Sequence, residues 1–184
     1  TGYTAGAEIT SLLANPTLAD GFEGWDRTFV GESMTAGGVK ELMPAAEAWN
    51  CTFEMQQTLT GLTNGIYMLQ ANAAFRPAGD YLSTLHGAVL RAGGNVNFVM
   101  VEGEDVLPIE DAEDGMNCHL TGEWTDRHFI NDEVDGYVPV GPLGCSYAFA
   151  SGRYLNSVAV EVTDGTLTVG ISNPGTGMKN DWVG

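Results

Sequence analysis

The sequence predicts an all-β fold, an antiparallel β-sandwich or jelly roll, from three observations. Apolar and polar residues alternate along several segments with the period of a strand. Clusters of Gly, Pro, Asn and Asp, which are typical of turns, separate these segments, and 25 of the 184 residues are glycine. Segments with helical periodicity are few and short, so the many strands are expected to pack against one another in two sheets.

A hairpin is expected over residues 53–75. Asn64 and Gly65 supply its two-residue turn, because both residues tolerate the positive φ angles of a type I′ turn. Beyond the turn, apolar residues alternate with others from Tyr67 to Phe75, which gives the second strand one apolar face.

Shorter elements are expected on both sides of this hairpin, bounded by turn residues. Strands are expected over residues 26–31, 84–91, 96–101 and 145–150. A turn or two of helix is the most that we expect over residues 7–14, 108–116 or 151–155.

A second hairpin is expected over residues 158–171, around a type I′ turn at Asp164 and Gly165. Apolar residues alternate on both sides of the turn, and the expected register puts all of them on one face. The expected pairs are Val162 with Leu167, Val160 with Val169, and Val158 with Ile171. A second layer must cover that face, so the hairpin is expected to form half of a packed sandwich.

The charge of the chain argues against two classes of partner. Seven Lys and Arg against 24 Asp and Glu give a net charge of −17. Nucleic acids and anionic membrane surfaces bind clusters of Lys and Arg, so neither is expected as a partner. No apolar run approaches the roughly 20 residues of a membrane-spanning helix, so we expect no membrane insertion.

Half of the acidic residues fall within residues 102–135, where Arg127 is the only Lys or Arg. Like charge at this density resists burial, so the segment is expected to be a long exposed excursion between strands. The whole chain, residues 1–184, is expected to form one domain with a sizeable core.

The cysteines, Cys51, Cys118 and Cys145, are too few and too widely spaced for a disulfide framework or a zinc site. Their odd number leaves at least one thiol free. Cys51 lies in an expected strand and is interpreted as a small buried apolar residue. A bridge between Cys118 and Cys145 is left open.

Four segments of the chain together resemble one recurring domain. They are "NPTLADGFEGW" (15–25), "AWNCTFEMQQTLTGLTNGIYMLQANAAFR" (48–76), "GYVPVGPLGCSYAFASGRYLNSVAVEVTDGTLTVGI" (136–171) and "NDWVG" (180–184). In this order they are similar to the galactose-binding-like β-sandwich, of the carbohydrate-binding-module type, found in secreted and surface proteins of gut anaerobic bacteria. The resemblance implies a jelly roll that binds a glycan or polysaccharide beside the attached domains of a larger protein.

The resemblance also implies a closing strand after the final Asp-Trp, whereas this sequence stops at Gly184. A sheet edge is then expected to be open, which favours strand addition or a strand-exchanged dimer. The acidic excursion is long for such a domain.

The aromatic residues divide into two groups. The resemblance implies packing for one group, which is expected in the core: Trp25, Trp49, Phe53, Tyr67, Phe75, Phe149, Tyr154 and Trp182. A sugar site needs an exposed aromatic face that stacks on the sugar ring, with polar groups that bond its hydroxyls. The expected site therefore lies in loops, with Trp124 as its main residue, and with Tyr81, Phe129, Tyr137, Arg76, Arg127 and His128. The alternative for Trp124 is that it pins the long loop onto the sandwich.

A structural Ca²⁺ is implied by the resemblance, because related sandwiches hold one near the start and end of the chain. Asp20, Glu23 and Asp181 are the ligands expected here. The alternative is that the acidic residues are solvated and keep a secreted module soluble.

We recognise no pattern of catalytic residues in the sequence, so we do not expect an enzyme. The three His residues lack the spacing of a zinc site, and no nucleophile, acid and base fall together. The expected function is a non-catalytic carbohydrate-binding module, extracellular or on the cell surface. The alternative is a structural or protein-interaction module without glycan affinity; a jelly-roll lyase or hydrolase is a weaker third interpretation.

Overall fold

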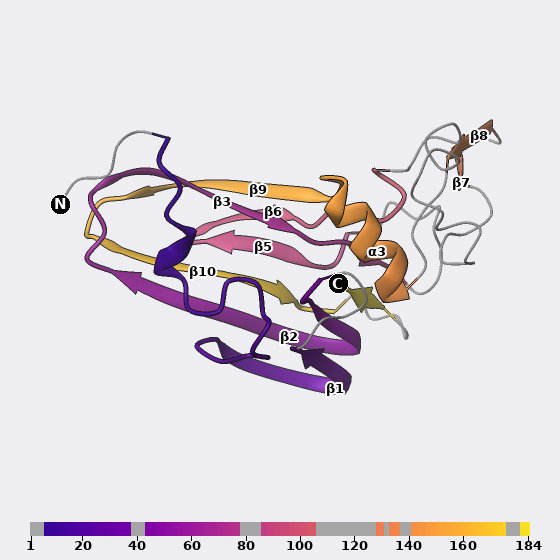
Figure 1. Ribbon diagram of the computed structural model, residues 1–184, viewed down its shortest axis with the longest axis horizontal. Coiled ribbons are helices and arrows are strands. Elements are labelled where there is room, and N and C mark those ends of the chain that lie inside the picture. Colours follow the sequence, from indigo (N-terminus) through magenta and orange to yellow (C-terminus); the bar gives the residue numbers. More distant parts are fainter. Residues whose placement is uncertain are drawn as a thin grey trace.

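Two layers of antiparallel strands make up the fold, with turns at one end and α3 at the other (Figure 1). The computed structural model describes residues 6–37, 43–77, 86–105, 128–130, 133–136, 141–175 and 181–184. The elements are η1 (Thr10–Leu12, a 3₁₀ turn), β1 (Asp26–Ala36), β2 (Ala46–Thr60), β3 (Gly65–Asn72), β4 (Phe75–Arg76), β5 (Val89–Ala92), β6 (Asn95–Phe98), β7 (His128–Ile130), β8 (Glu133–Gly136), α3 (Gly141–Ala150), β9 (Leu155–Val162), β10 (Thr166–Asn173) and β11 (Trp182–Val183).

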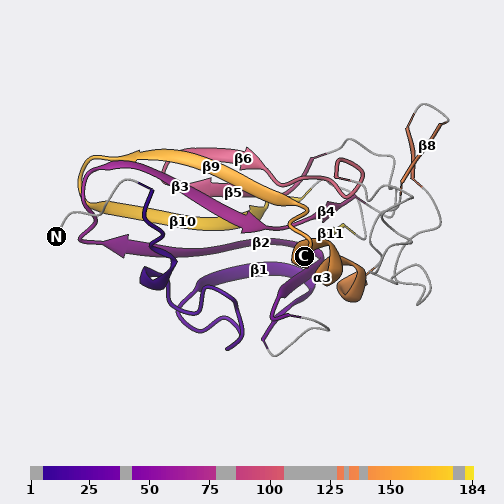
Figure 2. The ribbon, with the colours of Figure 1, turned by 45° about the horizontal axis from the view of Figure 1, so that its top comes forward.

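The larger layer has the strand order β4-β11-β2-β10-β5-β6, and β1 also pairs with β2. The smaller layer consists of β3 and β9, which lie above β10 and β2 in Figure 2. β7 and β8 pair with each other apart from both layers. The prediction of an all-β sandwich is confirmed.

Both expected hairpins are wrong, because each of their turns joins the two layers. β2 pairs with β10 and β3 pairs with β9, so neither β2 with β3 nor β9 with β10 forms a ladder. The two turns instead lie side by side, where Asn64 Nδ2 donates to Thr163 O at 2.7 Å and Leu62 N to Gly165 O at 2.9 Å.

The reason lies in what alternation specifies. Alternation gives each strand one apolar face. It does not specify whether the next strand pairs with the first in the same sheet or packs against its apolar face from the other sheet. Here the apolar faces on the two sides of each turn meet across the core, so each layer covers the other. Members of both layers share one buried cluster: Leu62, Leu90, Ala92, Val158, Val160, Val162, Leu167 and Val169.

The strand expected over residues 145–150 is also wrong, because this segment is the end of α3. A continuous apolar run does not distinguish a buried strand from a buried helix. Pro142 stands in the first turn of α3, where proline is tolerated. Cys145 and Ala148, one turn apart, are buried against Tyr154 and Trp182.

The other short elements differ in length from those expected. Residues 26–31 extend into the longer β1, while residues 84–91 and 96–101 overlap the shorter β5 and β6. Residues 7–14 form only the η1 turn, and residues 151–154 form a turn before β9. Residues 108–116 lie outside the described residues.

Most of the expected core aromatics are buried or packed against the core, but Trp49 is 39% exposed, which corrects the prediction for it. Asn50 has φ of 47°, and this left-handed residue shifts the alternation of β2. Ala48 and Cys51 therefore both point inward, and Trp49 between them points outward. Opposite, Gly31 has φ of 141°, and a Cβ there would overlap the backbone of Asn50 and Cys51.

The remaining seven aromatics follow the prediction to different degrees. The fully packed ones are Phe53, Phe75, Tyr154 and Trp182, and the partly buried ones that pack on the core are Trp25, Tyr67 and Phe149. Cys51 is buried as expected, and its Sγ donates to Ser33 O at 3.2 Å. Cys145 is a free buried thiol, while Cys118 lies outside the described residues.

Candidate functional site

The outer face of the larger layer carries an exposed polar array. Because side chains alternate along a strand, the residues of β2, β10 and β5 that do not enter the core all project from this side. We call the polar face the set Glu54, Gln56, Thr58, Arg91 and Thr168, which come from these three strands.

Two interactions order the polar face. Arg91 Nη1 lies 3.1 Å from Glu54 Oε1, and each of these side chains is nearly half exposed. The hydroxyls of Thr58 and Thr168 are 2.8 Å apart. The guanidinium and the carboxylate are thus held in place while they keep groups free to bond a ligand.

A small hollow lies at the centre of the polar face, over Gly170. Its rim includes Glu54, Gln56, Arg91 and Thr168. Gly170 pairs with Gln56 on one side and Arg91 on the other, and a Cβ at this position would overlap Met55 O. Glycine is therefore required here, and its missing side chain leaves the hollow open.

An exposed aromatic ring stands at the edge of the same face. Phe98, on β6, is 57% exposed and pairs with Val89 of β5. Val96, two residues before it on the same face of β6, pairs with Arg91. The ring of His86 lies 5.0 Å from that of Phe98, which limits the movement of Phe98. β6 is three strand spacings from β2, so the backbones at Phe98 and Glu54 are about 14 Å apart across the sheet.

The chemistry of this face suits a neutral polyhydroxylated ligand. The guanidinium and amide donate, the carboxylate and amide oxygens accept, and the threonine hydroxyls do both. The Phe98 ring offers an apolar surface against which the C–H face of a sugar ring can pack.

A second cluster of polar groups lies at the end of the sandwich, around Glu102. Glu102 follows Val101, which bridges to Phe75, and its side chain has no exposed surface. This overturns the expectation that the acidic segment is solvated throughout. Cys145 Sγ donates to Glu102 Oε1 at 3.9 Å, whereas Glu102 Oε2 is buried without a hydrogen-bond partner among the described residues.

Burial raises the pKa of the Glu102 carboxyl to about 7, although the Arg76 cation and the Cys145 hydrogen bond favour the charged form. Burial, and next the nearby Glu102 carboxylate, also raise the pKa of Cys145 and of Tyr154. The Tyr154 hydroxyl donates to the backbone oxygen of Glu102. Three weak acids thus pack together in protonated form below neutral pH.

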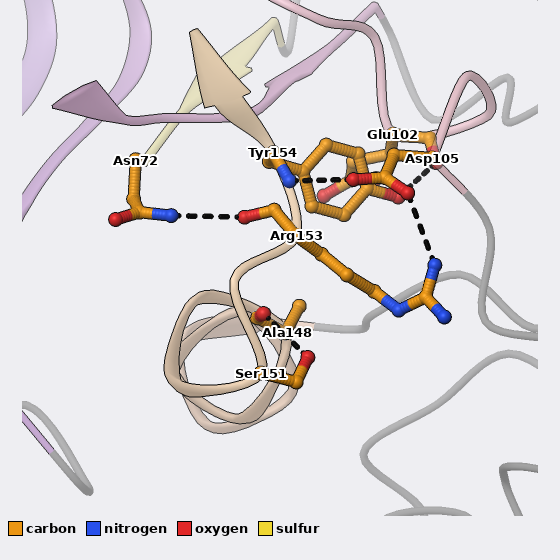
Figure 3. A network of polar contacts seen from close by, with 7 residues as sticks. All are labelled: Asn72, Glu102, Asp105, Ala148, Ser151, Arg153 and Tyr154. Atoms are coloured by element: carbon orange, nitrogen blue, oxygen red, sulfur yellow. Dashed lines mark hydrogen bonds and ion pairs between the residues drawn. The ribbon is translucent and has the colours of Figure 1, made fainter. Parts of the chain in front are cut away.

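Near Glu102, polar contacts tie Asp105 and β3 to the turn between α3 and β9, as Figure 3 shows. Asp105 accepts from Arg153 Nη1 at 3.0 Å and from Tyr154 N at 2.7 Å. Asn72 Nδ2 donates to Arg153 O at 3.0 Å, and Ser151 Oγ donates to Ala148 O at 2.7 Å. A carboxyl with a pKa near 7 is typical of acid–base catalysts, but Glu102 has no exposed surface for a substrate. We therefore assign this cluster to packing.

Of the residues predicted to bind a sugar, the structure describes the side chain of Arg76 and the backbone of His128 and Phe129. Arg76 lies at the end of β4, with its guanidinium 5.1 Å from the centre of the Trp182 ring, beside Glu102. His128 begins β7, and its side chain lies outside the described residues. The others, which also lie outside the described residues, are Tyr81, Trp124, Arg127, Phe129 (side chain) and Tyr137.

The predicted calcium ligands are not gathered by the described structure. Asp20 and Glu23 are exposed in the turns before β1, whereas Asp181 is buried next to β11. In the part of the chain that the structure describes, no three His, Cys, Asp or Glu side chains come together as a metal site. Calcium binding stays a prediction.

Comparisons with models of protein families, with curated proteins and with solved structures found no match. Within the described residues, no helix has the length and apolar character to cross a membrane.

Sequence reasoning missed the polar face, although the alternation of β2 contained a signal for it. Glu54, Gln56 and Thr58 occupy the positions between inward-facing residues, but only the structure shows that Arg91 joins them.

Proposed function

We propose that the protein is a non-catalytic carbohydrate-binding module of a secreted or surface-attached bacterial protein, and that the polar face is its sugar site. The observation that carries the proposal is the exposed Phe98 ring on the same outer face as the Arg91–Glu54 pair. An exposed aromatic ring beside hydrogen-bonding side chains suits a sugar, whose C–H face packs on the ring while its hydroxyls bond the polar groups.

Charge narrows the ligand to a neutral glycan. The chain carries a net charge of −17, which repels acidic polysaccharides, and the cation of the site, Arg91, is already paired with Glu54. The hollow is small, so each module is expected to bind weakly. Tethering to attached domains would then raise the effective concentration at a multivalent glycan surface.

The first prediction concerns substitutions on the polar face. We expect Arg91→Ala and Phe98→Ala each to weaken glycan binding at least about tenfold, because one removes charged donors and the other the stacking surface. A glycan array, followed by titration calorimetry on the best neutral oligosaccharide, measures this. Ile66→Ala is a matched control, since Ile66 is an exposed apolar residue (75%) on the other layer.

The same array distinguishes the polar face from the loop site predicted around Trp124. Binding that is lost in Trp124→Ala but kept in Phe98→Ala would move the site to the loops. Arrays run with Ca²⁺ and again with EDTA test the predicted calcium. A blank array under both conditions would contradict the proposal and favour the structural or protein-interaction module.

A further inference from the structure

Trp49 is an exposed aromatic residue on the same side of the larger layer as the polar face. It is 39% exposed, and the outward positions that follow it on β2 include Thr52 and then Glu54, where the polar face begins. Trp49 and Glu54 are at most about 17 Å apart along the strand, since they are five positions apart in the sequence. β11 pairs with β2 from Trp49 toward Ala48, away from Thr52 and the polar face. The outer side of β2 therefore leads from the polar face to the Trp49 ring.

The outward direction of Trp49 results from two unusual backbone positions. Strict alternation from Cys51, which faces the core, would direct Trp49 into the core as well. Instead, Asn50 has φ of 47°, a conformation that few residues other than Gly, Asn and Asp adopt. On β1, Gly31 lies opposite Cys51, and a Cβ at this glycine would overlap Asn50 O. Both strands thus depart from regular geometry at the point where the ring is turned outward.

Polar contacts hold Asn50 in this conformation and flank the ring. Asn50 N donates to Asp181 O at 2.7 Å, and Asn50 Nδ2 donates to Glu32 Oε1 at 2.8 Å. The Thr52 hydroxyl donates to Val30 O at 3.4 Å. A carboxylate accepts more than one hydrogen bond, and a hydroxyl that donates can also accept, so Glu32 and Thr52 can bond the hydroxyls of a ligand.

The exposure of this ring favours a role in binding. Burial of an indole stabilises a fold through its large apolar surface, and the protein forgoes part of this stabilisation at Trp49. Left-handed residues other than glycine are themselves unfavourable, and they cluster at sites where they direct a group toward a ligand. An exposed indole between hydroxyl and carboxylate groups is suited to the C–H face of a sugar ring.

We propose that Trp49 is a second stacking surface for the glycan, and that a sugar chain bound at the polar face continues along the outer side of β2, past Thr52, to the Trp49 ring. This inference rests on the proposed function, because it takes the polar face as the other end of the site. A single sugar cannot contact both the Arg91–Glu54 pair and Trp49. The ligand class therefore narrows to linear neutral oligosaccharides and polysaccharides.

The test measures binding of linear neutral oligosaccharides of increasing length, from disaccharide to hexasaccharide, by titration calorimetry. The probes are cello-, xylo- and manno-oligosaccharides. The affinity of the wild-type protein for at least one series is expected to rise at least about tenfold with length, as the chain reaches Trp49. Trp49→Ala is expected to remove this rise, whereas Phe98→Ala is expected to lower the affinity at every length.

Matched variants separate stacking from general apolar contact. Trp49→Phe retains an aromatic face and is expected to keep most of the rise with length. Val30→Ala removes a side chain that is 77% exposed on the neighbouring strand, in register with Thr52, but cannot stack; it is expected to bind as the wild type does. Thermal unfolding confirms that each variant folds. In the wild type, the indole N–H signal of Trp49 in nuclear magnetic resonance spectra is expected to shift with the hexasaccharide.

Two results would overturn this inference and leave the proposed function standing. One is an affinity that changes with length in the same way in Trp49→Ala as in the wild type, while Phe98→Ala lowers it. The other is a loss in Val30→Ala equal to that in Trp49→Ala, which would indicate apolar contact without stacking.

Two other results would overturn the proposed function as well. Binding that is lost at every length in Trp49→Ala but kept in Phe98→Ala would exclude the polar face, and with it the path along β2. The absence of binding by every oligosaccharide up to about 1 mM, together with a blank array, would contradict a sugar site anywhere on this face.

Discussion

Replacing Asn156 by Ala is expected to lower the free energy of unfolding by about 4 kcal/mol, because it removes the side-chain partner of Ala73 O and Met100 N and one of the two donors to Tyr154 O. Asn156 is 3% exposed at the start of β9. Its Nδ2 donates to Ala73 O and to Tyr154 O, both at 2.8 Å, and its Oδ1 accepts from Met100 N at 2.8 Å. One side chain therefore joins the smaller layer to the segment that leads to Glu102.

Urea unfolding followed by far-ultraviolet circular dichroism measures this effect. Asn156→Asp is expected to cost nearly as much, because it keeps the acceptor for Met100 N but loses the donors. The matched control is Asn72→Ala, since Asn72 is exposed and makes one bond, at 3.0 Å to Arg153 O. This control is expected to cost less than about 1 kcal/mol. A similarly small loss in Asn156→Ala would contradict the account of the three bonds.

The sequence was sufficient to predict the long strands and, along β2 and β9, the residues that face the core, but it wrongly predicted a strand over residues 145–150, which end α3. The odd-numbered positions of β2 from Cys51 onward and the valines of β9 are inward-facing as alternation requires. Alternation is a local property, so it did not predict that β2 and β10 pair while β3 lies in the other layer. Pairing across a turn depends on where the core lies, which is decided by the whole chain.

The candidate site was less predictable than the fold, for a related reason. Glu54 and Arg91 are separated by 37 positions and meet only because β10 lies between their strands. Composition suggested that Glu102 is solvated with its acidic neighbours, yet its position after the Val101 bridge places it in the interior. The exposure of Trp49 likewise depends on one backbone angle, at Asn50.

Replacing Glu102 by Gln is expected to stabilise the protein progressively as pH rises. The Glu102 carboxyl has a pKa of about 7 in the folded protein, against an ordinary value of 4.5, because burial disfavours its charged form. The folded state therefore holds this proton more tightly than the unfolded state. The protonated Glu102 carboxyl makes its whole contribution to stability below about pH 4.5, and this contribution is lost as pH rises to about 7.

Gln is neutral at every pH, so only the wild type loses stability as pH rises. The difference in free energy of unfolding, Glu102→Gln minus wild type, is expected to rise by about 3 kcal/mol between about pH 4.5 and pH 8. Urea unfolding at steps of pH measures this difference. Glu161→Gln, at an exposed position of β9, controls for the loss of one negative charge.

A difference that stays constant with pH would show that the Glu102 carboxylate is ionised in the fold at all these values. The Arg76 cation, which opposes the effect of burial, would then dominate. A rising difference means instead that the charge appears only above neutral pH, next to the buried thiol of Cys145 and the hydroxyl of Tyr154. Because Glu102 bonds Cys145 of α3 and Tyr154 of the turn before β9, its ionisation would loosen this end of the sandwich and leave the polar face, on β2, β5 and β10, unchanged.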